Sequence, residues 1–301
     1  ILAEPQRTNL VTYSEDFSNA SWVTVSGSVT KSYNTTTSPS GLEDADSILA
    51  TSAGSIVWAT YQPLTADYTG TLYLKRKTGS GDIQFTASGT FSTVDLSSGD
   101  WVRVEHTYSA TAGTKAIGIK IVDSGDEVYI WGAQLEVGSY ATSYIPTSGS
   151  TVTRNQDIFT RDGIGSLINS TEGVLFVEFK RVEGNSSTSA ISLNDGTSSN
   201  GVSMYFFGVS NFYVDVFSSS GTITLNGGIV NTSDYIKVAF KYKNGDSAIW
   251  INGIEVTTNS GAISLVGLNQ LLFAYINGTT PFFGKVKQLQ VYDTSLSDNQ
   301  L

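Results

Sequence analysis

The clearest structural pattern in the sequence is an alternating stretch that holds two Asn-Gly pairs. Residues 236–256 read IKVAFKYKNGDSAIWINGIEV. Apolar side chains at every second position from Ile236 to Tyr242 predict a strand with one buried and one solvated face. Asn244-Gly245 and Asn252-Gly253 fit type I′ turns, whose two central residues need positive φ angles. The stretch therefore predicts a three-stranded antiparallel meander.

The same period-two alternation recurs along the chain between clusters of Gly, Asn, Asp and Ser. It predicts further strands at Thr71–Lys77, Trp101–Tyr108, Ile117–Val122, Val128–Val137, Gly173–Lys180 and Phe283–Tyr292. In the last of these strands the apolar positions change parity between Val286 and Leu289, which predicts a bulge near Lys287-Gln288. No long amphipathic helix is apparent, and Leu42–Leu49 could form a single helical turn at most.

A polar segment divides the chain near its middle. Thr147–Asp157 reads TSGSTVTRNQD, lacks periodicity and has the composition of a linker. A length of 301 residues suits two domains of ordinary size, and the two halves do not align as copies of each other. We expect an all-β chain with two consecutive antiparallel β-sandwich (jelly-roll) domains, at residues 1–150 and 161–301, joined by a linker at 151–160.

Composition excludes several classes of function. The chain has 17 Lys and Arg against 27 Asp and Glu, and neither half is basic, so nucleic acid and anionic membranes are poor partners. No apolar run approaches the ~18 residues of a membrane span, so membrane insertion is not expected. The absence of Cys excludes disulfides and zinc–thiolate sites. Because the chain starts at Ile1 without a signal peptide, we expect a processed product or an excerpt of a longer protein.

Residues suited to catalysis are scarce. His106 is the only His, and alternation puts it on the same face as Val104, which favours a structural role. Glycoside hydrolases need two carboxylates across the scissile bond. Glu178 stands alone in its strand, and Asp44 and Asp46 lie in a turn-like stretch. We therefore expect no enzymatic activity and no cofactor.

Several segments resemble known modules. Asn9–Trp22 (NLVTYSEDFSNASW) resembles the opening of carbohydrate-binding-module-like β-jelly rolls. Tyr129–Arg154 (YIWGAQLEVGSYATSYIPTSGSTVTR) closely resembles the end of that module as it recurs in phage virion proteins. The second half is similar to laminin-G/concanavalin-A-like lectin domains at Gly173–Phe176, Ala248–Gly253 and Phe283–Val286.

The order of the two modules is similar to that in phage tail-fibre, tail-tip and head-decoration proteins. This resemblance implies a non-catalytic structural protein on the virion surface, with lectin-like modules that bind host-cell surface polysaccharide. It further implies contacts with other virion proteins and a homo-oligomer, with a trimer favoured. Two alternatives stay open. One is a purely structural decoration or spacer protein, and the other is a secreted bacterial carbohydrate-binding protein or a fragment of a glycoside hydrolase.

Aromatic side chains support the sugar-binding hypothesis, because sugars stack their C–H faces on flat rings while polar side chains bond the hydroxyl groups. In the first domain the candidates are Trp58 and Tyr61, with Gln134 and Glu136 as polar partners. In the second domain the possible surface aromatics are Tyr205, Tyr213 and Tyr275, among which the sequence gives no basis for choice. Burial in a core is the alternative for each aromatic residue.

A structural calcium ion is a further property of related jelly rolls. Such ions are held by an acidic residue near the first strand and an Asp in the last strand. Glu15 and Asp16 are the candidates near the first strand. The last strand carries Gly132-Ala133 at the place expected for the Asp, with Glu136 nearby, so the chain departs from the calcium-binding pattern.

Overall fold

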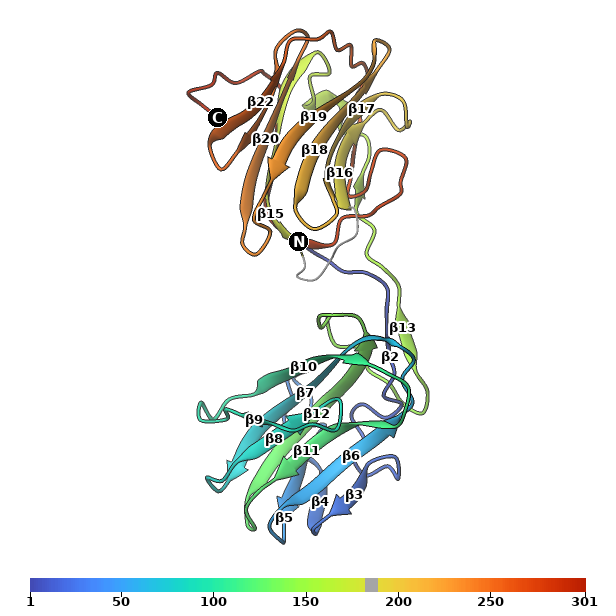
Figure 1. Ribbon diagram of the computed structural model, residues 1–301, viewed down its shortest axis with the longest axis vertical. Coiled ribbons are helices and arrows are strands. Elements are labelled where there is room, and N and C mark those ends of the chain that lie inside the picture. Colours follow the sequence, from blue (N-terminus) through green and yellow to red (C-terminus); the bar gives the residue numbers. More distant parts are fainter. Residues whose placement is uncertain (182–188) are drawn as a thin grey trace. The chain divides into compact units, whose positions relative to one another are not determined.

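Antiparallel β-strands make up nearly all of the regular secondary structure (Figure 1). The structure is a computed structural model that describes residues 1–181 and 189–301. It divides into two units, which we call the N-terminal unit (Gln6–Asn155) and the C-terminal unit (Gln156–Leu301 together with Ile1–Pro5). The prediction of an all-β chain built from antiparallel sandwiches is confirmed.

Two five-stranded sheets form the N-terminal unit. The first sheet has the order β10 (Val102–Ala110), β7 (Ala66–Thr78), β12 (Glu127–Val137), β5 (Ala45–Ala50) and β4 (Val29–Thr36). The second has the order β3 (Val23–Ser26), β6 (Ser55–Tyr61), β11 (Lys115–Ile121), β8 (Ile83–Thr86) and β9 (Ser92–Val94). A short ribbon pairs β2 (Arg7–Asn9) with β13 (Val152–Arg154). Alternate side chains of the facing strands, such as Ile117 and Ile119 of β11, fill one core between the sheets.

Two six-stranded sheets form the C-terminal unit. One has the order β1 (Leu2–Ala3), β24 (Gly284–Tyr292), β15 (Glu172–Arg181), β20 (Ile236–Lys243), β21 (Ser247–Ile251) and β22 (Ile254–Asn259). The other has the order β14 (Thr160–Arg161), β23 (Gln270–Leu272), β16 (Ser189–Asn194), β17 (Gly201–Phe207), β18 (Asn211–Ser218) and β19 (Gly221–Ile229). A three-residue 3-10 turn, η1 (Gly165–Leu167), is the only helical element in the described part of the chain. Within those residues no helix is long and apolar enough to cross a membrane.

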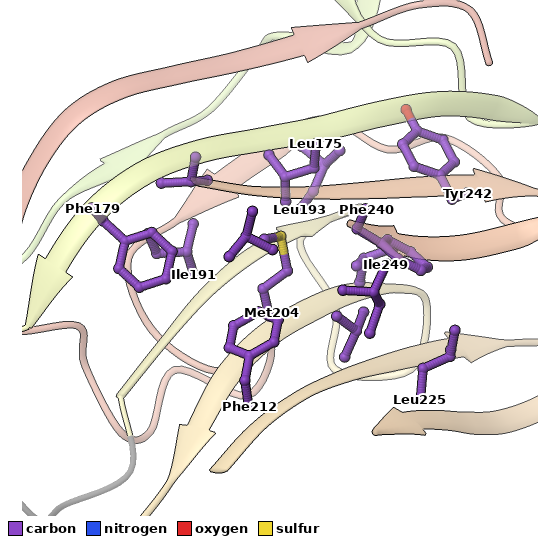
Figure 2. Packing of buried hydrophobic residues seen from close by; sticks show 14 of the residues in the cluster. Leu175, Phe179, Ile191, Leu193, Met204, Phe212, Leu225, Phe240, Tyr242 and Ile249 are labelled. Carbon is purple, nitrogen blue, oxygen red and sulfur yellow. The ribbon is translucent and has the colours of Figure 1, made fainter. Parts of the chain in front are cut away.

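The core of the C-terminal unit lies between these two sheets. Figure 2 shows side chains of β15, β20 and β21 meeting those of β16, β17 and β18. Phe212, Phe240 and Tyr242 are among its largest fully buried side chains. Because strand residues alternate between faces, the neighbours of these core residues point outward. The outer face of β16–β19 therefore presents side chains that are not needed for packing of the core.

The predicted meander at residues 236–256 is present as β20, β21 and β22. Asn252 and Gly253 have φ angles of 53° and 79°, as a type I′ turn requires. At the first turn only Gly245 has a positive φ, so the prediction of type I′ geometry is wrong there. That connection also includes Asp246, and the Asn244 side chain accepts a hydrogen bond from the Ile263 backbone N–H.

Two other local predictions have opposite outcomes. The bulge near Lys287-Gln288 is confirmed, because Glu178 pairs with Gln288 whereas Phe179 pairs with Val286. The helical turn considered for Leu42–Leu49 is wrong. Residues 45–50 form strand β5, which pairs with both β4 and β12 and buries Ile48 completely. Hydrogen bonding of β5 to a strand on each side outweighs the weak local preference of these residues for a helical turn.

The chain between the units is partly structured. The linker was expected at residues 151–160, and in the structure Val152–Arg154 form β13 within the N-terminal unit. Ile1–Pro5 belong to the C-terminal unit, because Leu2 and Ala3 pair with Lys285 and Gly284 of β24.

A buried polar network holds the segment that follows β12. Glu136, fully buried, accepts hydrogen bonds from the backbone N–H of Thr142 (2.8 Å), the Thr142 hydroxyl (2.7 Å) and the Gln134 side-chain amide (2.8 Å). Its second oxygen lies 3.5 Å from Nε of Arg7. Gln134 in turn accepts a hydrogen bond from the Ile145 N–H (2.7 Å). The two side chains therefore fasten residues 142–145 over the outer face of β12.

Replacing Glu136 tests this network. Glu136→Ala leaves the two buried donors of Thr142 without their acceptor and removes the shortest hydrogen bond of the Gln134 amide, so we expect the free energy of unfolding to fall by about 3 kcal/mol. Urea unfolding followed by Trp fluorescence reports mainly on the N-terminal unit, which holds Trp22, Trp58, Trp101 and Trp131. The control is Glu43→Ala, an exposed site where we expect a change within about 0.5 kcal/mol. Equal stability of the two variants would contradict this role of Glu136.

Candidate functional site

Trp58 lies on the outer face of the sheet that contains β6. Its neighbours Val57 and Ala59 pack into the core, so alternation turns the indole outward. The indole is half-buried and stacks almost parallel to Phe91, with ring centroids 6.3 Å apart and an interplanar angle of 8°. Gly118 is its partner on β11, where a Cβ atom would lie 2.5 Å from the Cβ of Trp58. The structure thus places Trp58 where a flat ligand could reach it.

The other three candidates from the sequence lie elsewhere. Tyr61 is on the opposite face of β6 from Trp58, where it packs against Tyr68 and its hydroxyl donates to the backbone oxygen of Ala87. Gln134 and Glu136 are fully buried in the network described above. The structure therefore does not bring these residues together with Trp58, and of the four only Trp58 both faces outward from its sheet and stays partly exposed.

Glu15 and Asp16, the calcium candidates, are engaged in local hydrogen bonds. Glu15 accepts one from the Tyr144 hydroxyl (3.0 Å), and partial burial raises the pKa of its carboxyl. Asp16 accepts from the backbone N–H groups of Ser18 and Asn19 and stabilises the turn that follows it. Among the described residues, no three His, Cys, Asp or Glu side chains lie together in a group that could hold a metal ion.

Three tyrosines of the C-terminal unit converge on the outer face of β17 and β18, and we call them the tyrosine cluster: Tyr205, Tyr213 and Tyr275. Tyr205 and Tyr213 are direct cross-strand partners, with stacked rings whose centroids lie 5.6 Å apart at 24°. Tyr275 meets Tyr205 edge to face at 5.4 Å and contacts Phe217 in the same way at 5.9 Å. All three tyrosine side chains are half-exposed.

A loop brings Tyr275 to the two strands. Residues 273–283 follow β23 and cross the outer face at β16 and β17 (Figure 1). The Ser192 hydroxyl donates to the Ala274 carbonyl (2.6 Å), and the Ile276 N–H donates to the Ser203 hydroxyl (3.2 Å). These hydrogen bonds hold the loop on both sides of Tyr275, so the ring is fixed against the sheet.

Asp215 lies beneath the tyrosine cluster. It shares the outer face of β18 with Tyr213 and is only 5% exposed. Its carboxylate accepts hydrogen bonds from the hydroxyl groups of Tyr275 and of Thr224, the latter at 2.6 Å. Thr224 is its cross-strand partner on β19 and is exposed. The site thus combines flat aromatic faces with hydroxyl groups at the surface.

Burial and the Asp215 carboxylate both raise the pKa of tyrosine hydroxyls in the cluster. Burial is the larger cause that raises the pKa of Tyr205 and of Tyr275, and the negative charge of Asp215 adds to it. Both hydroxyls therefore keep their protons at neutral pH, where they can serve as hydrogen-bonding groups.

Part of the tyrosine cluster and its surroundings could have been predicted from the sequence. The spacing from Tyr213 to Asp215 and Phe217 puts all three on one face of a strand, which alternation could have shown. Nothing local links Tyr275 to them, because its place depends on the loop at 273–283.

His106 lines a groove of 400 Å³ between the edge strands β9 and β10 of the N-terminal unit. Thr93, Glu105 and Thr107 also line it. The Nδ1 atom of His106 is buried and has no hydrogen-bond partner within the described residues, so no carboxylate orients the ring as a catalytic dyad requires. The groove therefore gives no support for His-assisted catalysis.

The chain is similar in fold to several solved proteins. A CBM40 module of Ruminococcus gnavus IT-sialidase, bound to α2,3-sialyllactose, matches with a TM-score of 0.40 and 20% identity over 48% of this chain and 96% of that one. Tandem CBM22 domains of Paenibacillus barcinonensis Xyn10C match with a TM-score of 0.34 and 13% identity over 96% and 98%. A tail fibre protein of an E. coli phage matches with a TM-score of 0.27 and 11% identity over 97% and 40%.

Comparison of the sequence with models of known families and with curated proteins gave no match. Carbohydrate-binding modules are thus among the structures that the chain is similar to, at low sequence identity.

Titration of the single His, His106, tests whether its side chain is partly buried. Partial burial lowers the pKa of His106, so its NMR signals are expected to titrate below the ordinary value of about 6.5. The pKa of His106 is lower in the folded protein than in the unfolded chain. The contribution of His106 to the free energy of unfolding is therefore present at pH values above the pKa of the unfolded chain, and it is lost as the pH falls through the pKa of the folded protein. His106→Gln should therefore lose less stability than the unaltered protein on acidification through this range, and a titration above 6.5 would contradict the burial.

Proposed function

We propose that the chain is a non-catalytic carbohydrate-binding protein of a phage virion, which binds host-surface glycan through the tyrosine cluster. The observation that supports this most directly is the convergence of Tyr205, Tyr213 and Tyr275 on one outer sheet face above Asp215. Half-exposed rings supply flat apolar area, and the hydroxyl groups beside them supply hydrogen bonds for sugar hydroxyls. Trp58 and Phe91 offer a second, separate platform in the N-terminal unit.

Binding without hydrolysis is supported by the carboxylates around the cluster. A glycosidase needs two carboxyl groups flanking the scissile bond, roughly 5–9.5 Å apart. Asp215 is the only acidic residue in strands β16–β19, and it lies beneath the rings with its oxygens accepting hydrogen bonds. The arrangement thus favours recognition over bond cleavage.

The virion setting is supported by the resemblance of Tyr129–Arg154 to the end of jelly rolls in phage particles. In this proposal the protein lies at the particle surface, contacts other virion proteins and forms a homo-oligomer, with a trimer favoured. Several weak sites on one particle then act together through avidity. A purely structural decoration or spacer protein is the second candidate, favoured by the fact that Gln134 and Glu136 of this segment serve internal packing.

Adsorption of particles to host cells, with and without enzymatic removal of surface polysaccharide, tests the function as a whole. Loss of adsorption after removal is the expected result. Unchanged adsorption would favour the structural role, and release of reducing sugar by the purified protein would favour a hydrolase.

Single substitutions in the tyrosine cluster are the first molecular test. Tyr205→Ala or Tyr213→Ala removes one stacked ring and should weaken glycan binding by about 1–3 kcal/mol while the fold survives. A printed glycan array followed by calorimetry measures the change. Tyr235→Ala is the matched control, since Tyr235 is an exposed tyrosine of the same unit that contacts Lys287 outside the cluster. Equal losses in all three variants would contradict the site.

Trp58→Ala tests the second platform. Removing the indole that stacks on Phe91 should weaken binding by about 1–3 kcal/mol if this face holds a sugar ring. The effect should persist when Tyr205 is already replaced, because the two faces belong to separate units and act independently. Unaltered binding by Trp58→Ala alone would leave the tyrosine cluster as the sole site.

A further inference from the structure

The face that carries the tyrosine cluster has no cationic side chain in the strands and loop that form it. Strands β16–β19 and residues 273–283 contain neither Lys nor Arg, and Asp215 is the only charged residue among them. Carboxylates and sulfates on ligands are usually bound by Arg or Lys through charge-assisted hydrogen bonds. An anionic sugar at this face would instead meet the negative charge of Asp215, a residue that is 5% exposed.

Asp215 also fixes the direction of the hydroxyl hydrogens around it. An ionised carboxylate only accepts hydrogen bonds, so the groups bonded to it must donate. Thr224 donates to one oxygen at 2.6 Å and Tyr275 donates to the other. The Thr224 and Tyr275 hydroxyl groups therefore point their hydrogens toward the carboxylate, away from the surface.

The surface of the site then presents lone pairs. Each hydroxyl has one hydrogen and two lone pairs, so a hydroxyl that donates inward can only accept from a ligand. A sugar hydroxyl can donate to such an oxygen. A carboxylate or sulfate has no hydrogen to donate, and it would place its lone pairs against those of Tyr275 and Thr224.

We propose, on the basis of carbohydrate binding at the tyrosine cluster, that this site takes neutral saccharides and rejects acidic ones. Asp215 is the positioning residue of this selectivity. It orients the Tyr275 and Thr224 hydroxyls as acceptors and keeps the face negative. The ligand class is a neutral glycan whose hydroxyl groups donate hydrogen bonds to the rim of the cluster.

Matched pairs of polysaccharides test the selectivity in the chain with both units present. Affinity electrophoresis compares dextran with carboxymethyl-dextran, and galactan with polygalacturonate. We expect at least about tenfold tighter binding to the neutral member, because the acidic member loses several hydrogen bonds to the hydroxyls of the site. Asp215→Asn should lower the ratio of neutral to acidic binding, since its amide donates a hydrogen bond and frees one hydroxyl hydrogen for the ligand.

Asp195→Asn is the control for the charge change. Asp195 lies in the turn after β16, where it accepts hydrogen bonds from Thr197, and its replacement should leave the selectivity ratio unchanged. A second measurement needs no variant. Raising the salt from about 0.05 M to about 0.5 M screens the repulsion, so binding of the acidic polymers should strengthen while neutral binding stays constant.

The outcomes separate this inference from the proposed function. Binding to no polymer and to no arrayed glycan overturns carbohydrate binding itself. Equal or tighter binding of the acidic members that is lost in Tyr205→Ala overturns the selectivity while the site stands. A folded Asp215→Asn protein with an unchanged ratio and no salt effect overturns the role of Asp215.

Discussion

A buried carboxylate dictates how the N-terminal unit closes. Glu136 points away from the sandwich core, on the outer face of β12, and yet it is fully buried. Isolated charge in such a place is costly, so the chain must supply donors. Residues 142–145 do so with backbone and hydroxyl groups, and Arg7 adds a cation. Residues 142–145 are, in physical terms, a cover that this carboxylate requires.

Asp215 shows the same constraint with a different outcome. It too lies on the outer face of a sheet and is buried, but its donors are side-chain hydroxyls that remain partly at the surface. The hydrogen bonds of Glu136 hold a main-chain segment over the outer face of β12. Those of Asp215 orient hydroxyl groups at a surface that a ligand can reach. The difference depends on what covers each carboxylate, since both accept hydrogen bonds from neutral donors and Glu136 has Arg7 in addition.

Local patterns were enough for the architecture and only partly for the site. Alternation identified the meander at 236–256 and the bulge at Lys287, because both follow from which face each side chain must occupy. Alternation also puts Gln134 and Glu136 on the face opposite Ala133 and Leu135, but it carries no information on a segment that folds over that face later in the chain. Tyr275 was unassignable for the same reason, since residues 273–283 and two serine hydroxyls determine its position.

The strand β1 has a consequence for the order of folding. Ala3 is buried in the core of the C-terminal unit and pairs with Gly284, so the first residues of the chain contact some of the last. Glu4 and Asp157 exchange two hydrogen bonds across 153 positions of sequence. When β2 and β13 have paired, Arg7 lies opposite Arg154, so the loop that joins Glu4 to Asp157 is shortened to a few residues. The shorter loop lowers the entropy cost of bringing Glu4 and Asp157 together by roughly 2–3 kcal/mol. Early folding of the N-terminal unit thus prepares the C-terminal unit to complete its sheet.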